Sequence, residues 1–333
     1  MKARPLQYLS IGAIAICCAS FAARAAASDS NAEIQAAQRQ FNAGNYAAAI
    51  STLQSAVAQN SSGAEAYYWL GRSYYEVSDF DSAVTQAEKA VSLDPKNSLY
   101  HQWLGRIYGG KADRDRSFSL AKKVKKEFED AVALNPSNLE ARRDLEEYCL
   151  DAPWIVGGNK DEALEQVNAI AAADPVQGHL ARAVYDREAL KKTDEAENEI
   201  QQVVAAKPAK IDPYLEVAGF FQTLNKPDDM RAAIQAGAAI SPNDARLAYY
   251  RGVAGVLSAT DLPAAERDLK SYLASTPDRS DWPPHAAARE WLGRLYETQG
   301  KRAEAAEQYR AALQLDPKRK EARARLAKLE KSQ

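Results

Sequence analysis

Cysteine, methionine and histidine are the residue types that this sequence has least of, with three Cys, two Met and three His in 333 residues. Cys17 and Cys18 lie in an N-terminal apolar run, which leaves Cys149 alone in the rest of the chain. A single thiol cannot form an intrachain disulfide, and we expect Cys149 to be buried as a small apolar side chain. The histidines stand in no HExxH or CxxC context, so we predict no metal site.

The sequence also lacks an excess of charge of either sign. Its formal net charge is −2, and 26% of its residues are charged. A mildly acidic chain gains nothing from the phosphates of nucleic acid, so we expect no nucleic-acid partner. Hydrophobic residues make up 46% of the chain, which is enough for a large buried core.

The first residues have the layout of a secretory signal peptide. Lys2 and Arg4 precede an apolar run over residues 6–22, and residues 25–27 are all alanine. We predict a signal peptide over 1–27, with cleavage before Ser28, and a mature chain over 28–333. The protein should then be periplasmic or secreted, with no stable membrane insertion. The alternative is a membrane-tethered assembly factor whose N-terminus stays uncleaved.

Sustained alternation of polar and apolar residues is absent as well, so we expect essentially no β-strand. Prolines instead recur at 33 to 41 residue intervals, and an alanine stands twelve residues before five of them. Because proline cannot continue a helix, each recurring proline indicates the end of a second helix and the turn to the next unit. The recurring prolines are Pro95, Pro136, Pro175, Pro208, Pro242, Pro277 and Pro317.

Two segments, 64–97 and 286–319, carry the clearest copies of the repeat. Each has Leu-Gly in its first half, a tyrosine three residues after the glycine, an alanine in its second half and a closing proline. These features resemble the tetratricopeptide repeat family over roughly 30–319. The resemblance implies an all-α, right-handed α-solenoid of about eight helix–turn–helix units, with residues 320–333 as a capping helix. The expected units are 30–63, 64–97, 98–138, 139–177, 178–210, 211–244, 245–279 and 286–319.

The resemblance also implies a non-catalytic scaffold that binds a peptide or protein in a concave groove of first helices, and the predicted signal peptide places this scaffold in the cell envelope. Trp-Leu-Gly-Arg occurs at 69–72, 103–106 and 291–294. Residues three apart share a helix face, so Trp and Arg should point to the groove while Leu-Gly packs inward. The predicted partner-binding residues of this strip are Tyr68, Trp69, Arg72, Tyr75, Trp103 and Arg106. The alternative is that these tryptophans fill gaps between successive first helices, with the arginines stacked on them.

Two insertions give a second candidate surface. Residues 109–126 and 152–158 lengthen neighbouring units, and each falls between the two helices expected there. We expect them to meet on one edge of the stack, where Trp154 would be a further partner contact. The alternative is that the insertions pack on each other and the basic residues of the first are solvated.

Residues 105–111 match the first seven positions of a phosphate-binding P-loop, but Ala112 stands where Ser or Thr would bind Mg²⁺. We interpret Gly105 as the Leu-Gly glycine of a first helix, needed because the second helix packs close to it. With no catalytic residue and no cofactor site predicted, we expect the protein not to be an enzyme. An accessory or enzymatic protein with a site on the groove or on the insertion edge stays open as the alternative. The pattern specifies no particular partner and no oligomeric state.

Overall fold

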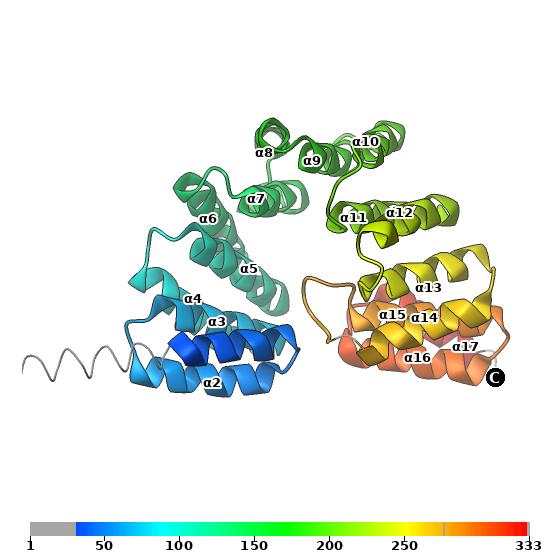
Figure 1. Cartoon of the computed structure of the whole chain (residues 1–333), viewed down its shortest axis with the longest axis horizontal. Coiled ribbons are helices and arrows are strands. Elements are labelled where there is room, and N and C mark those ends of the chain that lie inside the picture. The colour runs from blue at the N-terminus through cyan, green and yellow to red at the C-terminus, as the bar shows by residue number, and fades with distance from the viewer. Residues whose placement is uncertain (1–30, 276, 332–333) are drawn as a thin grey trace, which may run out of the picture. The chain divides into compact units, whose positions relative to one another are not determined.

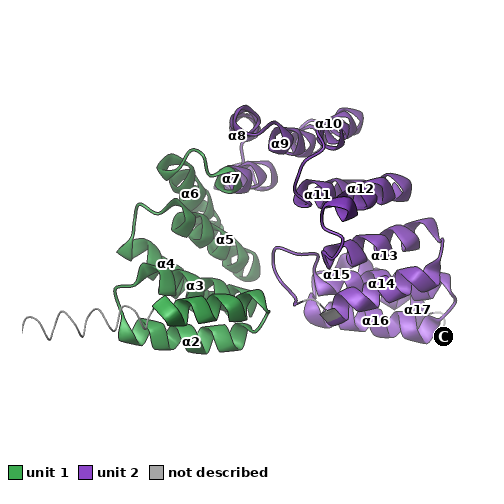
Figure 2. Ribbon diagram, viewed as in Figure 1, with its two compact units in different colours: residues 1–141 green, residues 142–333 purple. Residues whose placement is uncertain are grey.

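The computed structural model describes residues 31–275 and 277–331, and within these ranges the chain is helical with no β-strand (Figure 1). The predicted all-α fold is therefore confirmed. The predicted signal peptide lies outside the described residues. The chain divides into two compact units, Met1–Ala141 and Arg142–Gln333, with the boundary inside one helix (Figure 2).

The described part of unit 1 is a series of helical hairpins. A helix over residues 31–42 pairs with the next one, and consecutive helices then pack as pairs, α3 with α4 and α5 with α6. The first helices α3 and α5 also pack against each other. The labelled helices are α2 (Tyr46–Gln59), α3 (Ala64–Glu76), α4 (Phe80–Leu93), α5 (Ser98–Asp115), α6 (Phe118–Leu134) and α7 (Leu139–Asp151), which crosses the boundary.

Unit 2 continues the same pattern, and its first helices α9, α11, α13 and α15 form a row in which each packs on the next. The final helix packs against α16, as the predicted cap does. The elements are η1 (Trp154–Val156), α8 (Lys160–Ala173), α9 (Pro175–Glu188), α10 (Thr193–Ala205), α11 (Asp212–Thr223), α12 (Pro227–Ile240), α13 (Arg246–Ser258), α14 (Leu262–Ser275), α15 (His285–Thr298), α16 (Arg302–Leu315) and α17 (Lys320–Lys331).

The recurring prolines stand just beyond the second helices, as the sequence predicts. Pro95 follows α4, Pro242 follows α12 and Pro317 follows α16, each two residues after the last helical residue. Pro283 and Pro284 lie in a non-helical connector, and α15 begins directly after them. Proline therefore sets the length of each hairpin.

The paired helices approach most closely at small residues. Ala83, Ala163 and Ala305, each twelve residues before a recurring proline, have no exposed surface. A Cβ atom on Gly71 would lie 3.2 Å from the backbone nitrogen of Ala87 on the partner helix. The Leu-Gly glycine is thus the residue that lets the two helices of a hairpin close on each other.

The insertion over 109–126 is not a loop between two ordinary helices. Residues 109–115 complete α5 and residues 118–126 begin α6, so the extra residues lengthen both helices to 18 and 17 residues. The turn between them is a single residue in left-handed geometry, Arg116, followed by the cap Ser117. The inserted residues are mostly good helix formers, which explains why they extend the hairpin.

Candidate functional site

The strip predicted in unit 1 folds into a compact cluster of rings around one arginine. The guanidinium carbon of Arg72 lies 3.9 Å from the ring centre of Trp103, 4.6 Å from that of Trp69 and 4.9 Å from that of Phe41. Its Nη1 also donates a hydrogen bond of 3.1 Å to the Tyr68 hydroxyl. Cation–π attraction and one hydrogen bond hold this charge among aromatic rings.

Burial decides between the two interpretations of the strip. Tyr68 and Trp103 are each only 6% exposed, and Tyr68 stacks on Tyr100 at 5.0 Å. Tyr75 is half-buried and meets Trp103 edge-on at 6.3 Å. The rings of Tyr68 and Trp103 thus fill the space between the first helices α3 and α5. The expectation that these two rings are open groove contacts needs correction, because the neighbouring first helix covers them.

In all three Trp-Leu-Gly-Arg segments, the tryptophan and the arginine side chains lie on the same face of the helix. The arginine stacks over the tryptophan of its own segment at 4.6 Å for Arg72, 5.0 Å for Arg106 and 4.0 Å for Arg294. Arg106 also reaches Glu140, at 3.5 Å. The three-residue spacing fixes this stacking, while the neighbouring unit decides what else surrounds the charge.

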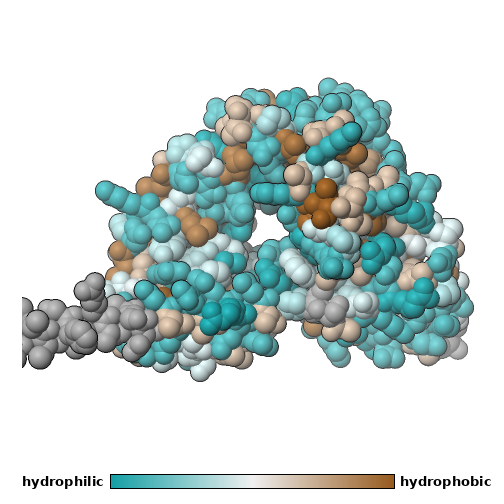
Figure 3. Space-filling model, viewed as in Figure 1, coloured by the Kyte–Doolittle hydropathy of each residue, from teal (hydrophilic) through white to brown (hydrophobic). Residues whose placement is uncertain are grey.

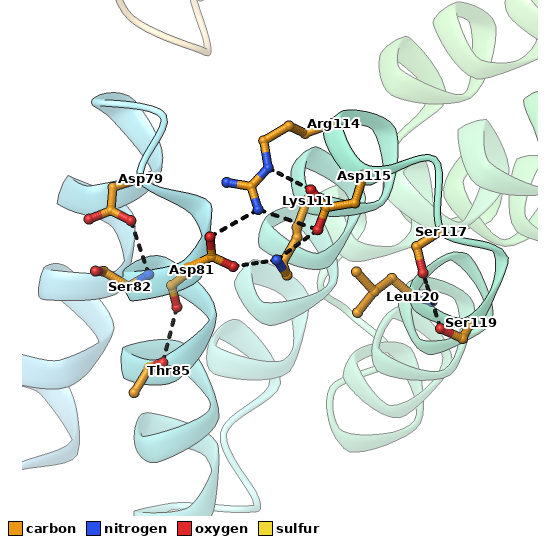
Figure 4. Close-up of polar contacts among 10 residues, drawn as sticks. All are labelled: Asp79, Asp81, Ser82, Thr85, Lys111, Arg114, Asp115, Ser117, Ser119 and Leu120. Carbon is orange, nitrogen blue, oxygen red and sulfur yellow. Dashed lines mark hydrogen bonds and ion pairs between the residues drawn. The ribbon is translucent and has the colours of Figure 1, made fainter.

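The segment that resembles a P-loop lies inside α5 and is engaged in ion pairs (Figure 4). The Lys111 ammonium contacts Asp115 at 2.7 Å and also pairs with Asp81 of α4. Arg114 pairs with the same two carboxylates, at 2.7 Å and 3.0 Å. A Cβ on Gly105 would lie 2.5 Å from the Phe128 ring, so this glycine serves hairpin packing. A phosphate-binding loop needs backbone N–H groups that are free and a lysine that is available for the phosphates. This segment is a continuous helix whose lysine is already ion-paired, so it does not form such a loop.

The second insertion presents two apolar side chains. Trp154 is 84% exposed and Ile155 is 56% exposed, whereas Val156 is buried. The short helix η1 is anchored to α7, because the Tyr148 hydroxyl donates a 2.9 Å hydrogen bond to the Val156 carbonyl. Residues 109–126 belong to unit 1 and residues 152–158 belong to unit 2, and their meeting on one edge stays a prediction.

A polar cleft of about 560 Å³ lies on the row of first helices in unit 2. It is lined from α7, α11 and α13 and closed by connector residues 280–284. Arg143 pairs with Glu216 at 2.7 Å, and Arg246 pairs with Asp212 at 2.8 Å. The guanidinium carbons of Arg246 and Arg279 lie 5.5 Å and 5.2 Å from the ring centre of Trp282 in the connector. Stacking thus fixes the connector at the rim of the cleft.

A second cleft of about 430 Å³ lies next to the first, and Gln222 and Tyr249 line both. Its floor includes Trp291, which is 7% exposed, and the stacked Arg294. None of the residues that the structure describes accepts a hydrogen bond from the Arg294 guanidinium. Burial, followed by the nearby charge of Arg325, lowers the pKa of Arg294. A half-buried cation without an acceptor favours an anionic group in this cleft.

A buried carboxyl lies one helical turn from Arg143. Glu146 is 3% exposed, and its Oε1 atom has no hydrogen-bond partner among the described residues. Burial raises the pKa of Glu146 to about 8, against a lowering by Arg143 and small increases from Glu147 and Glu216. The group is therefore protonated in the folded protein at neutral pH.

Unit 1 contains a group of side chains that the sequence reasoning missed. His101 of α5 lies beside Glu127 and Asp130 of α6, and their ligand atoms are all within 4.8 Å of one another. The hydrogen bond to Glu127 raises the pKa of His101 more than burial lowers it. The signal was hidden because these residues come from two helices and form no local motif.

The face shown in Figure 3 is mainly hydrophilic, with small separate hydrophobic areas. Such a surface does not single out a large apolar docking patch on that face. The clefts of unit 2 are therefore stronger candidates for a partner-binding site than the hydrophobic areas on this face.

The described chain consists of paired helices with Leu-Gly at the close approach of a pair, and its clefts lie on a row of first helices. This arrangement is that of a helical repeat protein. The tetratricopeptide repeat model matches residues 34–98 and 256–320, and both segments consist of paired helices. These two segments, which together make up less than half of the chain, are similar to tetratricopeptide repeats.

Solved structures resemble the chain at low identity. A tetratricopeptide repeat protein from Parabacteroides merdae ATCC 43184 is 13% identical, with a TM-score of 0.45 over 91% of this chain and 98% of that one. The Cut9–Hcn1 assembly of the APC/C is 13% identical, with a TM-score of 0.49 over 88% of this chain and 54% of that one. YrrB, described as having an unusual peptide-binding site, is 21% identical, with a TM-score of 0.39 over 52% of this chain and 84% of that one. No curated protein matches the sequence.

The buried ring of Trp103 yields a stability prediction. Trp103→Ala should lower the free energy of unfolding by about 3–5 kcal/mol, because it leaves a cavity between α3 and α5. Urea denaturation followed by circular dichroism measures this loss. Trp154→Ala is the matched control at an exposed position and should change the free energy by less than about 0.5 kcal/mol. A Trp103→Ala variant as stable as the wild type would show that the ring is not core.

The buried carboxyl of Glu146 yields a pH prediction. Its pKa rises from 4.5 to about 8 on folding, so the folded state binds the proton more tightly and stability falls as pH rises through this window. Glu146→Gln, which is neutral throughout, should match the wild type near pH 5 and exceed its free energy of unfolding by about 3–5 kcal/mol near pH 8.

Urea denaturation across this pH range checks the expectation. The exposed neighbour Glu147 supplies the control, since Glu147→Gln should keep nearly the wild-type pH dependence. A Glu146→Gln variant that is less stable than the wild type at pH about 8 would contradict the assignment of a protonated carboxyl.

Proposed function

We propose that this protein is a non-catalytic scaffold that binds a peptide segment of a partner protein along the first helices of unit 2. Tetratricopeptide repeat proteins bind protein or peptide partners, and this chain, which resembles them, has two clefts on its row of first helices. The single observation that carries the proposal is that these clefts are neighbours, since Gln222 and Tyr249 line both. Two neighbouring clefts along a row of helices suit an extended segment better than a compact small molecule.

The side chains of the groove suggest what the segment carries. Arg143 and Arg246 already have carboxylate partners, whereas the half-buried Arg294 guanidinium has none among the described residues. Arg319 lies in the same cleft and pairs with Glu290 at 2.6 Å. An acidic side chain placed over Trp291 would supply the acceptor that Arg294 lacks, in a charge-assisted hydrogen bond.

We further propose that this scaffold acts in the cell envelope. The support is the N-terminal sequence, in which Lys2 and Arg4 precede an apolar run and residues 25–27 are alanine. None of the helices in the described part of the chain is long and apolar enough to cross a membrane. A cleaved, exported chain is consistent with both observations.

Removing the charge of Arg294 tests the binding site. Arg294→Met keeps much of the apolar stem over Trp291 but removes the guanidinium, and it should weaken partner binding by about 10–100-fold. The measurement is a cross-linked pull-down with quantitative mass spectrometry, followed by titration of the captured segment.

Arg267→Met is the matched control, because Arg267 is exposed on the second helix α14 and lines neither cleft. It should capture the same partners as the wild type. Equal capture by the Arg294→Met protein would exclude this cleft as the place where the partner is recognised.

The export proposal predicts the mass of the mature chain. Intact-mass analysis of protein recovered from the extracytoplasmic fraction should show a chain that begins at Ser28. A chain that keeps residues 1–27 and sediments with membranes would instead support the tethered assembly factor. Recovery of the full chain from the cytosol would contradict both.

A further inference from the structure

The hairpin formed by α5 and α6 brings together one imidazole and two carboxylates. The Nδ1 atom of His101 lies 2.7 Å from Oε2 of Glu127 and 3.9 Å from Oδ2 of Asp130. Glu127 and Asp130 are three residues apart, so they project from the same face of α6. The three side chains thus converge from two helices of one hairpin, within unit 1.

The other ring nitrogen of His101 is held by the backbone. Its Nε2 lies 3.1 Å from the carbonyl oxygen of Pro95. A carbonyl can only accept, so Nε2 carries a hydrogen, and in the neutral ring Nδ1 is then the basic nitrogen. Histidines that bind metals are commonly oriented in this way, with the second nitrogen donating to a backbone carbonyl or carboxylate. The backbone contact therefore aims the basic nitrogen of His101 at the two carboxylates.

The spacing of the three groups suits a small divalent cation. Bonds of about 2.0–2.2 Å from Zn²⁺ to nitrogen and oxygen place two tetrahedral ligands about 3.3 Å apart. The observed separations of 2.7 Å and 3.9 Å lie on either side of that value. Side-chain rotation of Glu127 and Asp130 is enough to reach it. Lys126 pairs with Asp130 at present, but its side chain is 66% exposed and can turn into solvent.

We propose that His101, Glu127 and Asp130 form a Zn²⁺ site that joins α5 to α6. One imidazole and two carboxylates are a ligand set that zinc accepts, with water in the fourth position. The Asp130 side chain is 36% exposed, which gives that water and the ion access to the site. His101 is 8% exposed, so the ion is held at the edge of the hairpin core.

The site does not depend on the peptide groove, because its three ligands lie in unit 1 and the clefts lie in unit 2. Zinc bound there fastens α5 to α6, the two longest helices of the described chain. An ion that binds only the folded state also raises its stability, by an amount that grows with the logarithm of the ion concentration above the dissociation constant.

The full chain without a histidine tag, stripped with a chelator, is titrated with Zn²⁺ by calorimetry at pH about 7.5, with the expectation of about one ion per chain. Co²⁺ as a substitute should give the visible absorption of a four-coordinate site. Glu127→Gln and His101→Gln should each weaken Zn²⁺ binding by about 100-fold or more, since a ligand is lost.

His179 provides the matched control. It contacts Glu199 at 2.6 Å in unit 2 in the same manner, but it belongs to no group of three ligands among the described residues. His179→Gln should therefore bind Zn²⁺ like the wild type. Should His101→Gln fail to fold, the partly exposed Asp130→Asn gives the same comparison. Absence of Zn²⁺ binding by the wild type, or unchanged binding by Glu127→Gln, overturns the proposal and leaves His101 as an ion-pair partner only.

Discussion

The close approach of two short helices at small residues is the constraint on which the rest of the structure depends. The α-helices for which bounds are given have 12 to 18 residues, a length at which an isolated helix is marginal in water. Each must bury a face against its partner, and Ala83, Ala163 and Ala305 permit this by occupying almost no space between the axes. Where a glycine stands opposite instead, a ring fills the room, as Tyr309 does over Gly293. Hairpin closure thus fixes which face of every first helix remains for other contacts.

That remaining face has different chemistry in the two compact units. Between α3 and α5 it is filled with aromatic rings, and the charge of Arg72 is held among them by cation–π contacts. Along α11, α13 and α15 it is polar, and ion pairs such as Arg143 with Glu216 are half-buried. Half-buried pairs contribute little net stability, because desolvation offsets the attraction. They do fix side-chain positions, which is what a recognition surface requires.

The sequence predicted the features that depend on local spacing. A recurring proline follows seven of the second helices, and an alanine stands twelve positions before five of these prolines, so the division into helical hairpins followed from local patterns. The stacking of Arg on Trp followed from their three-residue spacing on one helix. Burial of Trp103 did not follow, because it depends on the distance to the neighbouring first helix. The convergence of His101 on Glu127 and Asp130 was missed because these residues come from the two helices of one hairpin and form no local motif.

The missed histidine group had one usable signal. If residues 109–126 are treated as an extension of both helices, the turn falls at Arg116, and residues at similar distances from that turn lie opposite each other. His101 then faces the stretch that contains Asp130, within one turn of helix. The expectation of a separate insertion hid this register. Recognising good helix formers in the inserted stretch would have placed the three ligands on one hairpin.

The three Trp-Leu-Gly-Arg segments show where differences between the repeats arise. Each places arginine over tryptophan, so the segment alone makes a cation–π pair and no more. Beside Arg72 the next first helix contributes Trp103, which closes the space and makes the pair part of a core. Beside Arg294 a cleft shared with α11 and α13 is left open. The same four residues therefore yield a structural element in one unit and a candidate recognition element in the other, and the difference lies in the adjacent helix.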